Sequence, residues 1–191
     1  QFLNVENGPR SFVVSSAGPG EGKATTKANL AIALAETGAR VALIDGDLRL
    51  PRVADYMGLE GGVGLTDVLI GRVQLVDAVQ RWGQNQLFVL TSGPVPPNPS
   101  ELLGSTAMDN VLATLTEHFD YVLIDAPPLL LVTDAAVLSK KTRGVIMVAA
   151  SGRTKKQELA GVFRTLETAG GALLGVVVTM LVAPPASLSA E

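Results

Sequence analysis

One glycine-rich run constrains the fold of this chain more than any other feature. The run Ala17–Lys23 follows a short apolar segment, Phe12–Ser16, and opens an amphipathic helical pattern, Lys23–Thr37. Glycines let the backbone curl so that successive N–H groups point inward around an anion, and the positive end of the following helix adds to that field. A strand, a glycine-rich loop ending in lysine, and a helix in this order predict a phosphate-binding loop.

The residues of this loop predict a nucleotide site that lacks one common metal ligand. Lys23 is placed to reach the β- and γ-phosphates, and Thr25 to contact an α-phosphate. The general pattern has Ser or Thr directly after the lysine, where the hydroxyl group ligates Mg²⁺. This chain has Ala24 there, and a methyl group cannot bind a metal ion. We expect the nucleotide contacts to come from Gly18, Pro19, Gly20, Glu21, Gly22, Lys23, Ala24 and Thr25.

The rest of the chain alternates short apolar runs with longer amphipathic ones, which is typical of an α/β protein. We expect a three-layer P-loop NTPase fold, with a mostly parallel central sheet and helices on both faces. Strands buried on both sides are predicted at Phe12–Ser16, Val41–Ile44, Phe88–Leu90, Tyr121–Ile124, Val145–Ala149 and Leu174–Met180. Helices are predicted at Lys23–Thr37, Arg52–Met57, Leu65–Ile70, Leu75–Val79, Glu101–Glu117, Ala135–Lys140 and Lys155–Ala169. Gly38 and Gly170 stand where helices should end, and Ser100 where one should begin.

Length and composition limit the classes of function. The 191 residues suit one domain, which we place at residues 1–181, followed by a loosely ordered tail at 182–191. A net charge of −3 offers no basic surface for nucleic acid. The chain has no cysteine and a single histidine, His118, so thiolate and multi-histidine metal sites are excluded.

Three aspartates stand at the ends of two predicted strands. Val41–Ile44 runs into Asp45 and Asp47, and Tyr121–Ile124 runs into Asp125. Ligands of an open α/β sheet gather at the carboxyl ends of its strands, where the phosphate loop is also expected. Carboxylate oxygens suit a hard cation such as Mg²⁺ that bridges nucleotide phosphates. The sequence therefore predicts a metal site formed by Asp45, Asp47 and Asp125.

These motifs together resemble the catalytic domain of bacterial tyrosine kinases, the family that regulates capsule and exopolysaccharide assembly. The likeness covers nearly the whole chain. It rests on the runs Ala17–Lys23, Ala42–Arg49, Leu90–Gly93, Pro97–Leu103, Val122–Pro128 and Thr133–Asp134. An Asp-x-Asp pair combined with a third aspartate before Ala-Pro-Pro is much more specific than a phosphate loop alone.

The resemblance implies tyrosine phosphorylation with ATP as donor, ADP as product and Mg²⁺ as cofactor. Lys23 would stabilise the transferring phosphoryl group, and Asp47 and Asp125 would hold the metal ion. Asp45 would help to hold it and would orient or deprotonate the attacking tyrosine hydroxyl. These few groups suffice because phosphoryl transfer depends mainly on positioning and charge stabilisation.

The same resemblance implies partners and a location. Members of the family work with a polysaccharide-copolymerase membrane protein, fused or separate, at the cytoplasmic face of the cell membrane. They assemble as homo-oligomers through an N-terminal Glu-x-x-Arg-x-x-Arg helix, which these residues do not contain, and phosphorylate a tyrosine-bearing tail of a neighbouring subunit. The only tyrosines here are Tyr56 and Tyr121, so the resemblance places any such tail beyond Glu191.

Two other classes of protein remain open at this point. A nucleotide-driven switch of the septum-site or partitioning type shares the architecture, but its loop carries a lysine five residues before Lys23, where this chain has Gly18. A non-catalytic regulator of polysaccharide assembly would bind nucleotide without turnover, and Ala24 is compatible with that function.

Overall fold

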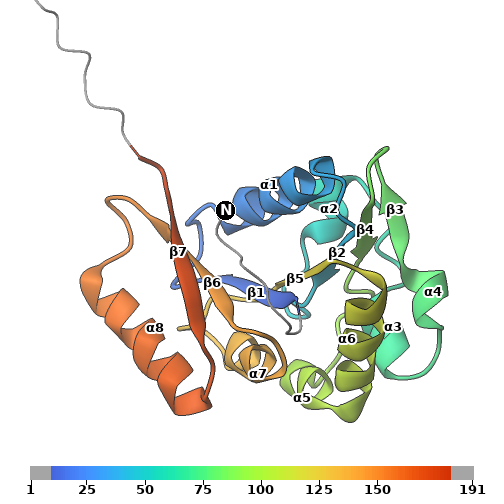
Figure 1. Cartoon of the computed structure of the whole chain (residues 1–191). Helices are drawn as coiled ribbons and strands as arrows, with labels where there is room; N and C mark the ends of the chain where they lie inside the picture. The colour runs from blue at the N-terminus through green and yellow to red at the C-terminus, as the bar shows by residue number, and fades with distance from the viewer. Residues whose placement is uncertain (1–9, 182–191) are drawn as a thin grey trace, which may run out of the picture.

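The computed structural model describes residues 10–181, in which a seven-stranded sheet lies between two layers of helices (Figure 1). The tail predicted at 182–191 and the first nine residues lie outside the described part of the chain. The strands are β1 (Ser11–Ser16), β2 (Val41–Asp45), β3 (Gln80–Trp82), β4 (Leu87–Leu90), β5 (Tyr121–Asp125), β6 (Val145–Ala150) and β7 (Leu173–Thr179). The helices are α1 (Lys23–Glu36), α2 (Val53–Met57), α3 (Leu65–Leu69), α4 (Leu75–Ala78), α5 (Pro99–Gly104), α6 (Thr106–His118), α7 (Asp134–Lys141) and α8 (Lys156–Ala169).

The order of the strands places the predicted site residues side by side. The sheet runs β3-β4-β2-β5-β1-β6-β7, and every neighbouring pair is parallel except β3 and β4. β5 lies between β1 and β2, and Asp45 is the register partner of Asp125. The carboxyl ends of β1, β2 and β5 therefore meet at one edge, directly below the loop that leads into α1. The predicted fold class is confirmed.

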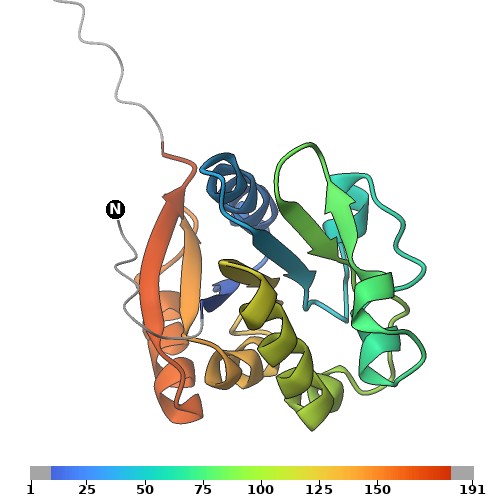
Figure 2. The same ribbon diagram turned by 45° about the vertical axis from the view of Figure 1, so that its right-hand side comes forward.

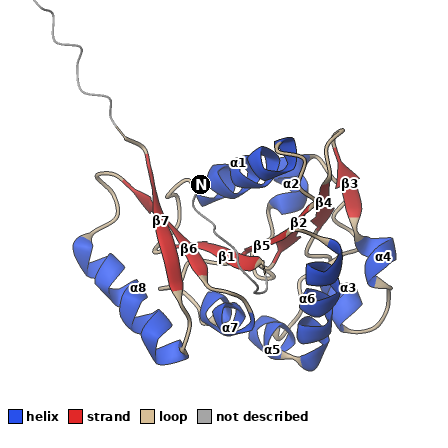
Figure 3. Ribbon diagram, viewed as in Figure 1, coloured by secondary structure: helices blue, strands red, loops and turns tan. Residues whose placement is uncertain are grey.

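Two apolar clusters explain why the central strands are apolar on both faces. One face packs Phe12, Leu43 and Leu123 against the alanine side of α1 and against α2. The other face packs Val13, Ile44 and Ile124 against the remaining helices, with α6 and α7 contributing much of the cluster. Figure 2 and Figure 3 show α1 and α2 on one side of the sheet and α5 to α8 on the other. None of the helices between residues 10 and 181 is long and apolar enough to cross a bilayer.

Helix ends and strand bounds agree with the sequence prediction in most places, and Gly38 and Gly170 adopt the expected left-handed conformation, with φ of 89° and 72°. The prediction of one continuous helix at Glu101–Glu117 is wrong. Ser105 adopts an extended conformation and divides this segment into α5 and α6. The Ser105 hydroxyl accepts a hydrogen bond from the N–H of Met108 and so caps α6. Ser100 caps neither helix, since α5 begins after Asn98 with Pro99 in its first turn.

The two edges of the sheet were the other points that sequence patterns missed. The short strand β3 was not predicted; it pairs antiparallel with β4, and the indole N–H of its Trp82 donates to the Met57 carbonyl at 2.9 Å. The last strand was predicted to be buried on both sides, and that is wrong. β7 is an edge strand that pairs only with β6 within the described residues, and most of its side chains are exposed, with Val178 at 50%.

Candidate functional site

The glycine-rich run forms the turn between β1 and α1 that a phosphate site requires. Gly20 and Gly22 have φ of 75° and 81°, in the left-handed region that glycine adopts without strain. Gly22 is the residue before the first turn of α1, and no side chain caps this helix end. The positive end of α1 is thus presented at the loop, where backbone N–H groups can bind a phosphate.

Side chains from distant parts of the chain hold this loop in shape. Glu21 is buried, and its carboxylate accepts hydrogen bonds from the Gly18 N–H at 3.1 Å and from the Thr154 hydroxyl. The Arg153 guanidinium donates to the Gly20 carbonyl at 3.0 Å, and the Thr179 hydroxyl donates to the Glu21 carbonyl at 2.7 Å. The loop is therefore fixed by the segment after β6 and by the end of β7, and the Glu21 side chain links Gly18 in the loop to Thr154.

Lys23 points to the carboxyl ends of β2 and β5. Its ammonium nitrogen is 3.0 Å from Asp125 Oδ1 and 3.9 Å from Asp47 Oδ2, and it donates a hydrogen bond to the Ala126 carbonyl. Lys23 is thus brought together with two of the three predicted aspartates. Asp125 Oδ1 is buried, and its contact with the Lys23 ammonium group is an ion pair without a hydrogen bond.

The glycine between Asp45 and Asp47 allows the ends of β2 and β5 to lie close together. The Gly46 N–H donates to the Asp125 carbonyl at 2.8 Å, so the ends of β2 and β5 are in direct contact. A Cβ atom at position 46 would lie 2.7 Å from that carbonyl oxygen, closer than real Cβ contacts allow. Only glycine therefore permits the two acidic strand ends to approach in this way.

Asp45 turns away from the phosphate loop. Its Oδ2 accepts the N–H groups of Arg52 and Val53, at 3.1 and 2.9 Å, and its Oδ1 accepts the N–H of Asp47 at 3.2 Å. Burial, and to a smaller extent the negative charge of Asp125, raise the pKa of Asp45 from 3.8 to about 6. The Asp45 carboxylate thus organises the start of α2.

Asp47 faces the loop and keeps one oxygen atom free of backbone contacts. Its Oδ1 accepts the N–H of Leu50 at 3.1 Å, while its Oδ2 is the atom nearest to Lys23. Burial raises the pKa of Asp47 above its usual range, and the Leu50 hydrogen bond opposes that rise. Asp47 Oδ2 and Asp125 Oδ1 are thus the two carboxylate oxygens available at the loop.

The donor atoms fit a divalent cation through two carboxylates. Within residues 10–181 no three acidic or histidine side chains converge in a metal-binding arrangement, because Asp45 is held by backbone N–H groups. The Ala24 side chain contributes no oxygen atom, and the neighbouring Thr25 hydroxyl accepts a hydrogen bond from Tyr56 at 3.2 Å. The remaining candidates are the two carboxylate oxygens that face Lys23, Asp47 Oδ2 and Asp125 Oδ1.

Sequence reasoning missed a second lysine at this site. Lys27 lies one turn after Lys23 on α1, is only 2% exposed, and forms an ion pair with Asp125 Oδ2. A signal was present, since Lys27 shares the buried side of α1 with Ala31 and Ala35. A charge on the apolar stripe of a helix needs a buried partner of opposite charge.

Arg49, two residues after Asp47, belongs to a polar cluster beside the site. Arg49 forms a two-point ion pair with the fully buried Asp134, at 2.8 and 3.1 Å, and also donates to Ser100 at 3.0 Å. This hydrogen bond with Asp134 raises the pKa of Arg49. The cluster ties the loop after β2 to the first turns of α5 and α7. Within this chain, Arg49 therefore stabilises the position of the loop that carries Asp47.

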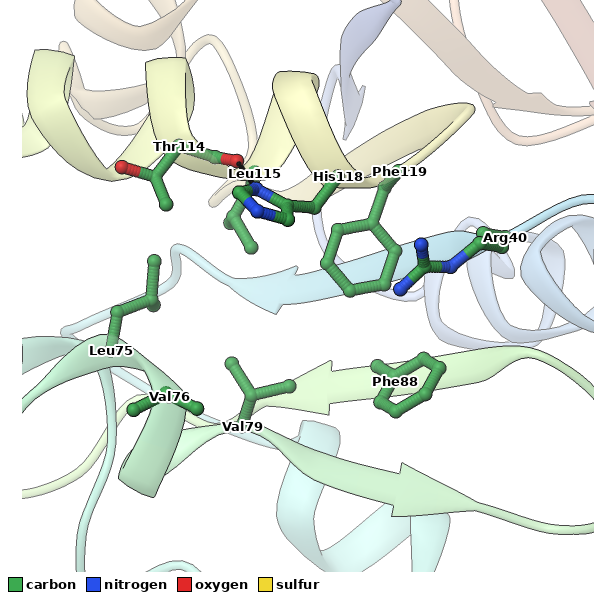
Figure 4. A pocket seen from close by; sticks show the side chains of 9 residues that line it. All are labelled: Arg40, Leu75, Val76, Val79, Phe88, Thr114, Leu115, His118 and Phe119. Atoms are coloured by element: carbon green, nitrogen blue, oxygen red, sulfur yellow. Dashed lines mark hydrogen bonds between the residues drawn. The ribbon is translucent and has the colours of Figure 1, made fainter.

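A separate cavity of about 290 Å³ lies beside the amino ends of β2 and β5 (Figure 4). Its walls are mainly apolar, and the Arg40 guanidinium group lies 5.4 Å from the centre of the Phe119 ring. The Phe88 and Phe119 rings meet edge to face with their centres 5.4 Å apart. The cavity is lined by none of the phosphate-loop or acidic residues described above.

Fold and site together define a phosphate-loop nucleotide-binding domain. Residues 10–168 match the AAA domain family. The chain is 43% identical over 177 residues to tyrosine-protein kinase YwqD of Bacillus subtilis (strain 168), covering 93% of this chain and 75% of that protein. It also matches the kinase domain of Escherichia coli tyrosine kinase ETK with a TM-score of 0.85 and 31% identity, over 92% of this chain and 71% of that one. The chain therefore belongs to the AAA domain family and, within it, to the bacterial tyrosine-protein kinases.

A septum-site protein shares the architecture at a greater distance. The septum site-determining protein MinD from Pyrococcus horikoshii, solved with Mg-ADP, matches with a TM-score of 0.74 and 28% identity, over 88% of this chain and 69% of that one. Both the TM-score and the identity are lower than for the ETK kinase domain. The similarity supports a common fold, and the higher TM-score and identity of the ETK kinase domain favour the kinase family over the positioning switches.

Proposed function

We propose that this chain is the ATP-dependent autokinase domain of a protein that regulates capsular or exopolysaccharide biosynthesis, phosphorylating tyrosine side chains. One observation carries the proposal: Lys23, Asp47 and Asp125 converge at the phosphate loop of a chain from the tyrosine-kinase family. The loop N–H groups and α1 would bind the phosphates, and Lys23 would move from Asp125 to the transferring phosphoryl group. ATP would be the donor and ADP the product.

The aspartates would share the remaining tasks. Asp47 and Asp125 would hold Mg²⁺, which when bound would neutralise charge on the phosphates. Asp45 was predicted both as a metal ligand and as the group that orients the tyrosine hydroxyl. For either role it would have to release the N–H groups of Arg52 and Val53, so these roles stay predictions.

The acceptor and partners follow from the family resemblance. We propose that the acceptor is a tyrosine-bearing tail of a neighbouring subunit in a homo-oligomer. A polysaccharide-copolymerase membrane protein, fused or separate, would place the domain at the cytoplasmic face of the membrane. Of the two tyrosines in the chain, Tyr121 lies in β5 at the centre of the sheet, whereas Tyr56 is half exposed on α2.

The second candidate function is a nucleotide-binding regulator without turnover, and Ala24 is the observation that favours it. Both candidates are tested with γ-labelled ATP, Mg²⁺ and a synthetic tyrosine-containing polymer, with labelled phosphotyrosine as the readout. The kinase proposal predicts transfer by the unmodified chain and faster transfer by Ala24→Ser, which restores a hydroxyl group. Nucleotide binding without transfer in both proteins would contradict the kinase proposal and support the regulator.

A further inference from the structure

Lys27 gives this site a positive charge that does not have to move when a ligand arrives. Its ammonium group contacts Asp125 Oδ2, on the opposite side of the carboxylate from Lys23, and it is buried between α1 and β5. Lys23 is more exposed, with 15% of its side chain accessible against 2% for Lys27. One lysine can therefore turn to a phosphate while the other stays with the aspartate.

The charges at the loop show why a resident cation matters. Three carboxylates, Asp45, Asp47 and Asp125, lie at or just after the strand ends, and those of Asp47 and Asp125 face Lys23 of the phosphate loop. When Lys23 turns to a phosphate, Asp125 Oδ1 loses the ammonium group that is 3.0 Å away. A buried carboxylate left without a counter-charge is strongly unfavourable, and it would also repel the phosphate. A divalent cation would ordinarily remove both penalties.

Two features of this chain point to a different arrangement. The position after Lys23 is Ala24, so the hydroxyl group that commonly ligates the metal ion is absent. The carboxylate of Asp125 is already paired with the Lys27 ammonium group, which weakens its attraction for a second cation. The affinity for a metal ion is thus lowered both at position 24 and at Asp125, and the fixed positive charge of Lys27 lies beside Asp125.

We propose that Lys27 replaces part of the charge of Mg²⁺ at this site, so that the domain binds nucleoside diphosphate at the phosphate loop with little dependence on a divalent metal. The inference rests on the proposed function, since it assumes that the loop binds nucleotide. A purely structural role is the alternative. However, a buried ion pair adds little net stability compared with apolar residues of similar size, which favours a role connected with ligand charge.

The test is the dissociation constant of ADP, measured by calorimetry in Mg²⁺ and again in EDTA, for the unmodified chain and for Lys27→Gln. Glutamine keeps a hydrogen-bond donor for Asp125 but has no charge. We expect the two constants to differ by less than about threefold in the unmodified chain, because the resident charge is present in both conditions. In Lys27→Gln the ratio should rise to roughly thirtyfold or more, mostly through weaker binding in EDTA, as expected for the loss of a unit charge close to the phosphates.

A matched control is Lys141→Gln, which removes a lysine paired with Asp109 on α6, away from the loop. Its ratio should equal that of the unmodified chain. A ratio above about thirtyfold in the unmodified chain would overturn the inference while leaving the proposed nucleotide site intact. An unchanged ratio in Lys27→Gln would also overturn it, and would mean that Lys27 is structural.

Absence of ADP binding in every condition would instead contradict the proposed function itself. Should Lys27→Gln fail to fold, the ratio for the unmodified chain still decides the question.

Discussion

The two ends of the same sheet differ sharply in what they bury. At the carboxyl ends of β2 and β5, Asp45, Asp125 and Lys27 are almost inaccessible and are held by ion pairs and backbone N–H groups. Beside the amino ends of the same strands, Phe119 packs against Phe88, and the exposed Arg40 lies over the Phe119 ring. These residues line a mainly apolar cavity. Buried charge reduces stability unless it is fully paired, whereas apolar packing adds to it. The difference indicates that the carboxyl end is organised for ligand charge and the amino end for stability.

Substitution at the charged carboxyl ends of β2 and β5 should reduce stability most. Asp125→Asn would leave the Lys27 ammonium group buried without a counter-charge, and removing one partner of a buried pair costs about 3–5 kcal/mol. The free energy of unfolding, measured with urea, should fall by that amount. As a control, Asp109→Asn breaks the ion pair with Lys141 on the surface, where we expect a loss below about 1 kcal/mol. Equal losses in the two variants would contradict the comparison.

The pH dependence of stability should also reveal the charged end. The pKa of Asp45 is about 6 in the folded chain against 3.8 ordinarily, so the folded state holds this proton more tightly than the unfolded state. Its contribution to stability is fully present below pH 3.8 and is lost as the pH rises through 6. The unfolding free energy of the unmodified chain minus that of Asp45→Asn should therefore fall by about 2.4 kcal/mol between pH 4 and pH 7.

Urea unfolding of both proteins at several pH values measures this difference and removes the contributions of other titrating groups. A difference that stays constant from pH 4 to pH 7 would show that Asp45 titrates normally, and that its burial carries no electrostatic cost.

The smallest effect is expected at the apolar end. Phe119→Ala would remove an edge-to-face contact with Phe88 and the surface on which Arg40 lies, at a cost of about 2 kcal/mol because the ring is only partly buried. The affinity for ADP should not change, since the cavity is separate from the phosphate loop. Thermal unfolding and calorimetry measure the two quantities. A weaker ADP affinity in this variant would show that the two ends are coupled.

The central part of the fold was predictable because its signals are local. The run Ala17–Lys23 specified a turn and a helix start, and parallel strands with apolar residues on both faces specified the central sheet. The rule that a continuous apolar run is a strand buried on both faces failed for β7. The same sequence pattern occurs in a strand covered by helices on both faces and in an exposed edge strand. The break at Ser105 was missed because the apolar spacing continues from α5 into α6.

The site was predictable in its positions and less so in its contacts. Sequence order brought Lys23, Asp47 and Asp125 to one edge of the sheet. Which atoms meet there depends on groups that are far apart in the chain, such as Arg49 with Asp134 and Glu21 with Thr154. The orientation of Asp45 follows from its hydrogen bonds with the N–H groups at the start of α2, which no residue pattern in the sequence predicts.

The most direct test of the account is the thermal midpoint with and without ADP, for the unmodified chain and for Lys23→Met. ADP at a hundredfold excess over its dissociation constant should stabilise the unmodified chain by about 2.7 kcal/mol, and Lys23→Met should lose nearly all of this stabilisation. An equal ADP-dependent shift in the two proteins would contradict the assignment of Lys23 and of the phosphate loop.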